Sequence, residues 1–169
     1  YLRTLQPDVL VSNRVDTPFG RGLDNPTWFV NEKESAGDYA VSEIAIPRFN
    51  RDIPWEYCQA AGKPDAWFWR PDDVYRPLDT WINELVNVVC RDGNYLIGFG
   101  AMPDGAFDPR LVAQLRQLGL WLERLGESVY GTRGGPFKPN AWYGSTCKGN
   151  NVYVHVFRTD DNQRLTLPP

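Results

Sequence analysis

Histidine and methionine are nearly absent from this chain of 169 residues, which contains one of each. The single histidine, His155, stands in an alternating stretch that is typical of a strand. Neither Cys58 nor Cys90 has the histidine partner that a thiol nucleophile needs. We therefore expect neither a histidine-dependent triad nor a cysteine nucleophile.

The chain also lacks several signatures of binding and targeting. Its three cysteines are an odd number without metal-type spacing, so neither a disulfide framework nor a zinc site is indicated. No apolar run approaches the roughly 20 residues of a membrane span. The net charge of −3 argues against a nucleic-acid partner. The chain begins with Tyr1, without a methionine or a signal-type apolar region.

Aromatic and apolar residues, by contrast, are plentiful. The composition is 42% hydrophobic and 14% aromatic, which is enough for one modest core, and seven residues are tryptophan. Tryptophan serves as core or interface material and also as a platform for sugar rings. Composition alone leaves both uses open.

Three short apolar runs predict buried strands, at residues 8–13, 53–58 and 94–99. Between the first two, residues 15–47 show no period, so we expect a long loop, which in a compact domain is usually functional or disordered. Helical segments follow the second and third runs. Strands alternating with helices indicate a parallel α/β arrangement.

Two helices are predicted from apolar residues at helical spacing. The first is expected to be capped by Asp79 or Thr80. The second spans Asp108–Leu125, with Asp108 as N-cap, Pro109 at the first helical position and Gly126 just past the end.

The pattern changes after residue 132. Residues 134–136 read Gly-Gly-Pro and predict a linker, and residues 148–151 predict a turn. Residues 151–157 alternate as a strand does.

Four motifs together resemble one known family. They are Gly37-Asp38-Tyr39, Trp55-Glu56-Tyr57-Cys58, the stretch 93–105 and the stretch 126–132. The chain resembles the second half of the α-L-fucosidase barrel, glycoside hydrolase family 29, from about Gln6 to about Phe157. The resemblance implies the second half of a (β/α)8, TIM-like barrel over residues 1–132. A linker and the beginning of a C-terminal β-sandwich are implied over residues 133–169.

The resemblance also implies the activity. Members are retaining glycosidases that release L-fucose from fucosylated glycans or glycoconjugates, with two carboxyl groups and no metal or organic cofactor. In that family the nucleophilic Asp lies on a strand before the segment that opens this sequence. The isolated chain is therefore expected to be a truncated, inactive fragment. Secreted, periplasmic and lysosomal settings are all implied, and no oligomeric state follows.

Glu43 is the best candidate for the catalytic acid/base. It resembles the family Glu that follows an Asp-aromatic pair, here Asp38-Tyr39, and we expect it on the loop after the strand that ends near Arg14. Loops at the carboxyl ends of strands form the active face of such barrels. Without the resemblance, Glu43 would be read as an ordinary exposed carboxylate. Glu56, flanked by aromatics, is the alternative acid, although a structural role is favoured for it.

Two further residues are expected to contact substrate. Arg14 resembles the family Arg that reaches the sugar ring, where a guanidinium can donate paired hydrogen bonds. Trp67 resembles an aromatic that packs on the C6 methyl of fucose. The sequence departs from the family pattern at Phe68-Trp69, where Gly-Tyr is usual, at Gly98, where Asn is usual, and at Ala101, where Pro is usual. Because these departures lie near the expected site, they allow divergent specificity.

Two other interpretations stay open. The chain could be a catalytically inactive carbohydrate-binding or interaction module derived from a fucosidase. It could also be an inert fragment whose open parallel edge is exposed to aggregation.

Overall fold

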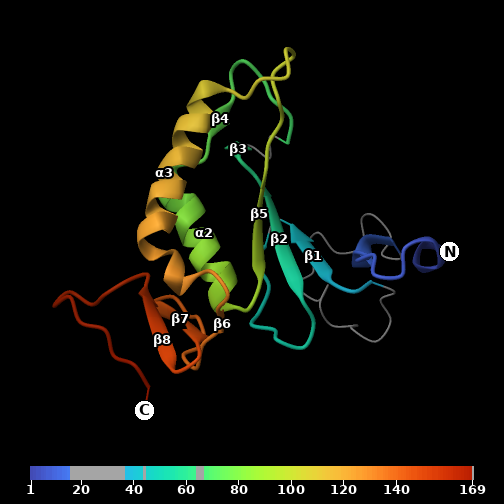
Figure 1. Cartoon of the computed structure of the whole chain (residues 1–169). Helices are drawn as coiled ribbons and strands as arrows, with labels where there is room; N and C mark the ends of the chain where they lie inside the picture. Colours follow the sequence, from blue (N-terminus) through green and yellow to red (C-terminus); the bar gives the residue numbers. More distant parts are fainter. Residues whose placement is uncertain (16–36, 44, 64–66, 169) are drawn as a thin grey trace.

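The computed structural model describes residues 1–15, 37–43, 45–63 and 67–168 (Figure 1). A three-stranded parallel sheet stands at the centre, two long helices lie along one side of it, and a smaller antiparallel sheet follows at the C-terminal end. No helix within these ranges is long and apolar enough to cross a membrane.

The parallel sheet has the order β1-β2-β5. Its strands are β1 (Ala40–Glu43), β2 (Trp55–Ala60) and β5 (Asn94–Gly98), and both pairings are parallel. The predicted strands at 53–58 and 94–99 are therefore confirmed as parallel neighbours, with the first displaced by two residues.

The two helices cover one face of this sheet (Figure 1). They are α2 (Leu78–Cys90) and α3 (Pro109–Leu125). The sheet side chains Trp55 and Tyr57 are buried with Val88 of α2 in one cluster. A second cluster buries Trp81, Leu111 and Leu118. The apolar residues that recur at helical spacing in the sequence are thus the ones that contact the sheet and the other helix.

The predicted cap of α3 is confirmed, and the predicted cap of α2 is wrong. Asp108 caps α3 by accepting a hydrogen bond from the Arg110 amide at 2.9 Å, and Pro109 follows it. Helix α2 instead begins after Pro77 without a side-chain cap. The fixed φ of Pro77 suits a helix start, and Asp79 lies inside the first turn, where a carboxylate favours the positive end of the helix dipole.

The apolar run at residues 8–13 does not form the predicted strand. Within the described part of the chain it makes a single parallel bridge, from Ser12 to Tyr39, and it lies between a short helix, α1 (Leu2–Leu5), and a 3-10 turn, η1 (Asn13–Val15). Leu10 is 76% exposed. The run borders β1 on the outer side of the sheet, where no other described strand extends the hydrogen-bond ladder.

Part of the expected long loop is a strand. Strand β1 (Ala40–Glu43) falls inside residues 15–47, and its first three residues are buried. A four-residue strand that is buried on both faces has no alternation to reveal it, which is why the periodicity failed there. Residues 16–36 of the expected loop lie outside the described residues.

A short hairpin follows β2 at its carboxyl end. Strand β3 (Gly62–Lys63) pairs antiparallel with β4 (Val74–Tyr75), and the segment between them carries Trp67. This hairpin leads directly into α2.

The C-terminal region forms an antiparallel sheet of β6 (Arg133–Gly134), β7 (Tyr143–Lys148) and β8 (Asn151–Val156), reached through a 3-10 turn, η3 (Gly126–Ser128). The predicted turn and final strand are confirmed, with a positive φ of 57° at Gly149 between β7 and β8. The predicted linker at 134–136 is wrong at its start, because Gly134 belongs to β6.

Asp92 explains why this segment is ordered. Its carboxylate accepts hydrogen bonds from the Gly134 amide at 2.6 Å and from Arg133. These bonds tie β6 to the end of α2, so a flexible-looking sequence becomes a fixed joint.

A partly buried polar network joins α2 to the sheet and to the residue that follows β4. Arg76 makes a two-bond contact with Glu84 of α2, at 3.1 and 2.6 Å, and the Tyr95 hydroxyl of β5 donates to the same carboxylate at 2.7 Å. The Tyr95 ring stacks on Tyr57, with centroids 6.0 Å apart. Burial, followed by the bond to Glu84, raises the pKa of the Tyr95 hydroxyl.

Candidate active site

The parallel sheet has one face covered by the helices and one face that they leave free. Residues paired in register across parallel strands point to the same side of a sheet. Glu43, Cys58 and Leu96 are in register, so they share one face, opposite to that of Trp55 and Tyr57. Leu96 is 40% exposed there. This free face is therefore open to a ligand.

Glu43 and Arg14 meet on the free face. The Arg14 guanidinium donates from Nη2 to Oε1 of Glu43, and the two side chains are 34% and 28% exposed. The two residues are 29 positions apart in the chain. Glu43 is the last residue of β1, not a loop residue as expected, and this fixes its backbone within the sheet ladder.

Tight backbone packing positions Arg14 beside Glu43. The Asn13 side chain accepts from the Val41 amide at 3.1 Å, and the Asn13 amide donates to the Tyr39 carbonyl at 2.9 Å. Gly37 comes so close to this segment that a Cβ there would lie 2.6 Å from Cα of Asn13. The Gly-Asp-Tyr motif at 37–39 thus has a structural reason, because only glycine allows that approach.

Asp38 holds the same junction on its outer side. Its carboxylate accepts from the Val11 amide at 2.8 Å and from Arg3 at 2.6 Å. The backbone bond from Val11 is the largest influence that lowers the pKa of the Asp38 carboxyl. Asp38 is therefore an anchor of the segment that carries Arg14, and no chemistry need be assigned to it.

The Arg14 guanidinium has a buried donor, its Nε–H group, without a hydrogen-bond partner among the described residues. A buried polar group without a partner costs about 1–3 kcal/mol. An oxygen acceptor that reached this group would remove that cost.

Cys58 lies beside Glu43, a placement that the sequence did not reveal. Burial raises the pKa of its thiol first, and the charges of Glu43 and Glu56 raise it further, while Arg14 acts in the opposite direction. The neighbourhood of Cys58 and Glu43 follows from the register of β1 and β2. The sequence pattern does not reveal β1, so it does not predict this register.

Trp67 lies on the same face at the carboxyl end of β5. Gly98 is in line with Leu96 on that strand, and a Cβ at Gly98 would be 2.7 Å from Cε3 of the Trp67 ring. The ring therefore occupies the space above Gly98. Strands β1 and β5 are separated by β2 and so lie roughly 10 Å apart, and Trp67 stands over Gly98, two residues beyond the level of Glu43 towards the carboxyl ends.

Glu56 occupies a different level of the same face. It is the second residue of β2 and is in register with Val41 and Asn94, towards the amino ends of the strands. Glu43 is in register two residues further on, opposite Cys58. Glu56 thus lies further from the carboxyl ends than Glu43 does.

The described residues contain no cluster of His, Cys, Asp or Glu side chains that could hold a metal ion. The three cysteines, Cys58, Cys90 and Cys147, are all free.

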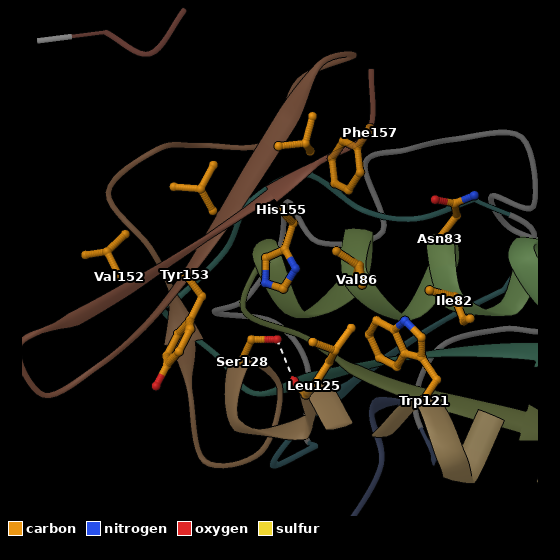
Figure 2. A pocket seen from close by; sticks show the side chains of 12 residues that line it. Ile82, Asn83, Val86, Trp121, Leu125, Ser128, Val152, Tyr153, His155 and Phe157 are labelled. Carbon is orange, nitrogen blue, oxygen red and sulfur yellow. Dashed lines mark hydrogen bonds between the residues drawn. The ribbon is translucent and has the colours of Figure 1, made fainter. Parts of the chain in front are cut away.

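A groove lies on the far side of the helices. Figure 2 shows this groove of about 570 Å³ between Ile82 and Val86 of α2, Trp121 of α3 and the side chains of β8, which include His155. Val88, on another side of α2, packs on the parallel sheet. The groove and the Glu43 face are therefore on opposite sides of the helix layer.

His155 has a structural setting in this groove. Its Nε2 lies 3.2 Å from the Thr146 hydroxyl, which itself donates to the Ser128 carbonyl at 2.6 Å. Burial lowers the pKa of His155. The ring thus contacts a hydroxyl group of the neighbouring strand β7.

The fold and the site define an α/β protein that carries a carboxylate–guanidinium pair on the free face of a parallel sheet. The family model described as alpha-L-fucosidase matches residues 13–127. The chain belongs to this family.

Relatives and solved structures agree with that assignment. Tissue alpha-L-fucosidase of Homo sapiens is 31% identical over 155 residues, which cover 85% of this chain and 32% of the relative. The corresponding protein of Macaca fascicularis is 32% identical, again over 85% of this chain and 32% of the relative. Alpha-L-fucosidase isoenzyme 1 from Paenibacillus thiaminolyticus superimposes with a TM-score of 0.73 at 27% identity, over 92% of this chain and 36% of that one. The chain spans about a third of the length of these relatives.

Proposed function

We propose that this chain supplies the acid/base side of a retaining α-L-fucosidase, in which it forms the second half of a (β/α)8 barrel and the start of a β-domain. Residues 1–132 would belong to the barrel and residues 133–169 to the β-domain. The observation that carries the proposal is the contact of Arg14 with Glu43 on the sheet face that the helices leave free. Family membership supports the substrate class. The substrate is a fucosylated oligosaccharide or glycoconjugate.

Glu43 takes the acid/base role in this proposal. It protonates the glycosidic oxygen as the bond to fucose breaks, and then accepts a proton from the water that releases the sugar. In the second step Glu43 acts as a carboxylate, and its contact with Arg14 would hold that carboxylate in place. The nucleophilic carboxylate of the first step comes from outside these residues.

Arg14 and Trp67 would orient the sugar. Arg14 holds the Glu43 carboxylate and has an unused Nε–H for an oxygen acceptor. Trp67 presents an indole ring across the same face, and an apolar ring suits the methyl group of a 6-deoxy sugar.

The role of Glu43 is tested by Glu43→Gln in a catalytically competent protein that contains this chain. Hydrolysis should slow by about 10²–10⁴-fold for substrates with poor leaving groups and far less for activated aryl fucosides, because only the former need a proton. Equal losses on both substrate types would contradict the assignment.

Glu56→Gln is the matched control, since it removes the same charge from the same sheet face. It should show no dependence on the leaving group. If the dependence appeared in Glu56→Gln and not in Glu43→Gln, Glu56 would be the acid.

The 169-residue chain alone should not hydrolyse fucosides. General acid catalysis contributes about 10²–10⁴-fold, whereas enzymes reach accelerations of roughly 10⁶-fold or more. Mixing the chain with a separately produced N-terminal part of a family member should restore turnover. Turnover by the chain alone, abolished by Glu43→Ala or Glu56→Ala, would show that the nucleophile lies within it.

A further inference from the structure

We propose that Gly98, Gly100 and Asp108 are positioning residues that fix the ring of Trp67, and through it set the preference for a sugar with a methyl group at C6. This inference rests on the proposed function, because it concerns how the same site selects its substrate.

The two glycines form a seat for the segment 67–69. A Cβ at Gly98 would lie 2.7 Å from Cε3 of Trp67, and a Cβ at Gly100 would lie 2.5 Å from the Trp69 amide nitrogen. Contacts this short do not occur for real side chains, so any larger residue must displace the segment. Gly98 is confronted by a rigid ring and Gly100 by backbone, and neither can give way as the tip of a flexible side chain does.

Asp108 holds the other side of the segment. The Trp69 indole N–H donates to Oδ2 of Asp108 at 3.2 Å, while Oδ1 of the same carboxylate accepts from the Arg110 amide to cap α3. Asp108 is 4% exposed. The Arg110 side chain is the main influence that holds the pKa of the Asp108 carboxyl well below its usual range. One ionised carboxylate thus links the start of α3 to the segment that carries Trp67.

Hydrogen bonds also fix the chain immediately after residues 67–69. Asp73 is buried and accepts from the Arg70 amide at 2.8 Å and from Nε of Arg70 at 3.0 Å. Residues 67–69 thus pack on Gly98 and Gly100, are hydrogen-bonded to Asp108, and lead into the turn between Arg70 and Asp73. The segment therefore has little freedom to move. Rigidity matters because a preorganised surface discriminates between ligands that a mobile ring would accommodate.

The apolar ring of Trp67 explains why the site would prefer L-fucose to L-galactose. L-fucose and L-galactose differ by a methyl against a hydroxymethyl group at C6. Burying a hydroxyl against an indole face without a partner is unfavourable. A hydrophobic wall rejects an added hydroxyl by about 10²-fold at most. We therefore expect a preference of about 10–100-fold that depends on the placement of Trp67.

The test compares Gly98→Ala with Gly119→Ala in a catalytically competent protein that contains this chain. Gly119 lies in α3 with open space where a Cβ would be, which makes it the control for adding a methyl group. Gly98→Ala should lower kcat/KM for an aryl α-L-fucoside at least about 10-fold and leave the aryl α-L-galactoside within about twofold. Gly119→Ala should change neither value. An unchanged ratio of the two substrates in Gly98→Ala would overturn the proposal.

Double variants separate positioning from general damage. If Gly98 acts through Trp67, Gly98→Ala should not alter the substrate ratio further in a Trp67→Ala background. Asp108→Asn keeps one oxygen, which can still cap α3, but it places an NH2 group where Oδ2 accepted from the Trp69 indole, so Asp108→Asn should lose the substrate ratio as Asp108→Ala does. Independent, additive effects of Gly98 and Trp67 would contradict the inference.

A structural readout keeps this inference distinguishable from the proposed function. With 5-fluorotryptophan incorporated, the fluorine resonance that disappears in Trp67→Phe is that of Trp67. It should shift in Gly98→Ala and not in Gly119→Ala, whether or not the protein hydrolyses fucosides. A parent protein without fucosidase activity would refute the proposed function. An unmoved Trp67 resonance would refute the positioning role alone.

Discussion

The two faces of the parallel sheet differ in what they contribute. On the helix-covered face Trp55 and Tyr57 are 1% and 3% exposed and pack on α2. On the free face Leu96 is 40% exposed, and Glu43 and Arg14 form an ion pair in contact with solvent. Since successive residues of a strand alternate between faces, neighbours in sequence serve different ends. One face holds the fold together, and the other carries the candidate chemistry.

The largest expected difference between the faces is in stability. Trp55→Ala should lower the free energy of unfolding by about 3–5 kcal/mol, because it leaves a cavity beneath α2. Leu96→Ala should cost less than about 1 kcal/mol, since its side chain is already partly in water. Denaturant unfolding followed by circular dichroism measures both. Comparable losses would mean that the two faces are packed alike.

The polar network beneath the helix should give the next largest effect. Glu84→Gln leaves the Arg76 guanidinium without its charged partner in a site where the two side chains are 17% and 15% exposed. We expect a loss of roughly 3 kcal/mol, the lower end of the range for breaking a buried pair. Tyr95→Phe, which removes only the hydroxyl, should cost about 1 kcal/mol. If Glu84→Gln were the milder change, the network would not be closed to water.

Thiol reactivity compares the free face, where Cys58 lies, with the interior at the end of α2, where Cys90 packs against Gly144 of β7. Cys90 is fully buried, and burial raises the pKa of its thiol to about 12, so it should react last with iodoacetamide at pH 8. Cys58 should react faster. Glu43→Gln should speed its alkylation a few-fold, because the charge of Glu43 helps to raise the pKa of that thiol. Peptide mass spectrometry follows each site, and Cys147 should keep its rate. No change at Cys58 would mean that Glu43 does not share its face.

The smallest effect concerns the far side of the helices. Burial lowers the pKa of His155 below its ordinary value of 6.5. Between the folded and unfolded pKa values the unfolded chain binds more protons, so stability from this group is present above about pH 6.5 and declines as the pH falls. His155→Gln should flatten the dependence of unfolding free energy on pH between 5 and 7. An equally steep profile in the variant would assign the dependence to other groups.

Local sequence patterns predicted the elements that depend on local physics. The pair Asp108-Pro109 predicted the start of α3 correctly, because the cap is a hydrogen bond between Asp108 and Arg110, two residues apart. The strand at 94–99 was readable from its apolar run. The capping of α2 was misread, because Pro77 starts that helix where Asp79 looked the better cap.

What local patterns missed are features created by distant neighbours. Strand β1 has four residues and no alternation, and it exists because its backbone pairs with β2. The run at 8–13 has a strand-like sequence and forms a single bridge. The Gly-Gly-Pro stretch looked like a linker, yet Asp92 holds Gly134 in a strand from 42 positions away.

The sequence by itself determined the family, the α/β class and the residues Glu43, Arg14 and Trp67 as candidates, because motifs and periodicity are written in consecutive residues. Only the tertiary structure decided that Glu43 ends a strand, that Arg14 contacts it, and that Gly98 gives its space to the Trp67 ring. The physical reason is that register and close approach depend on pairs of segments separated by about 30 residues. Their relative position is fixed by hydrogen-bond ladders and packing, and by no pattern within either segment.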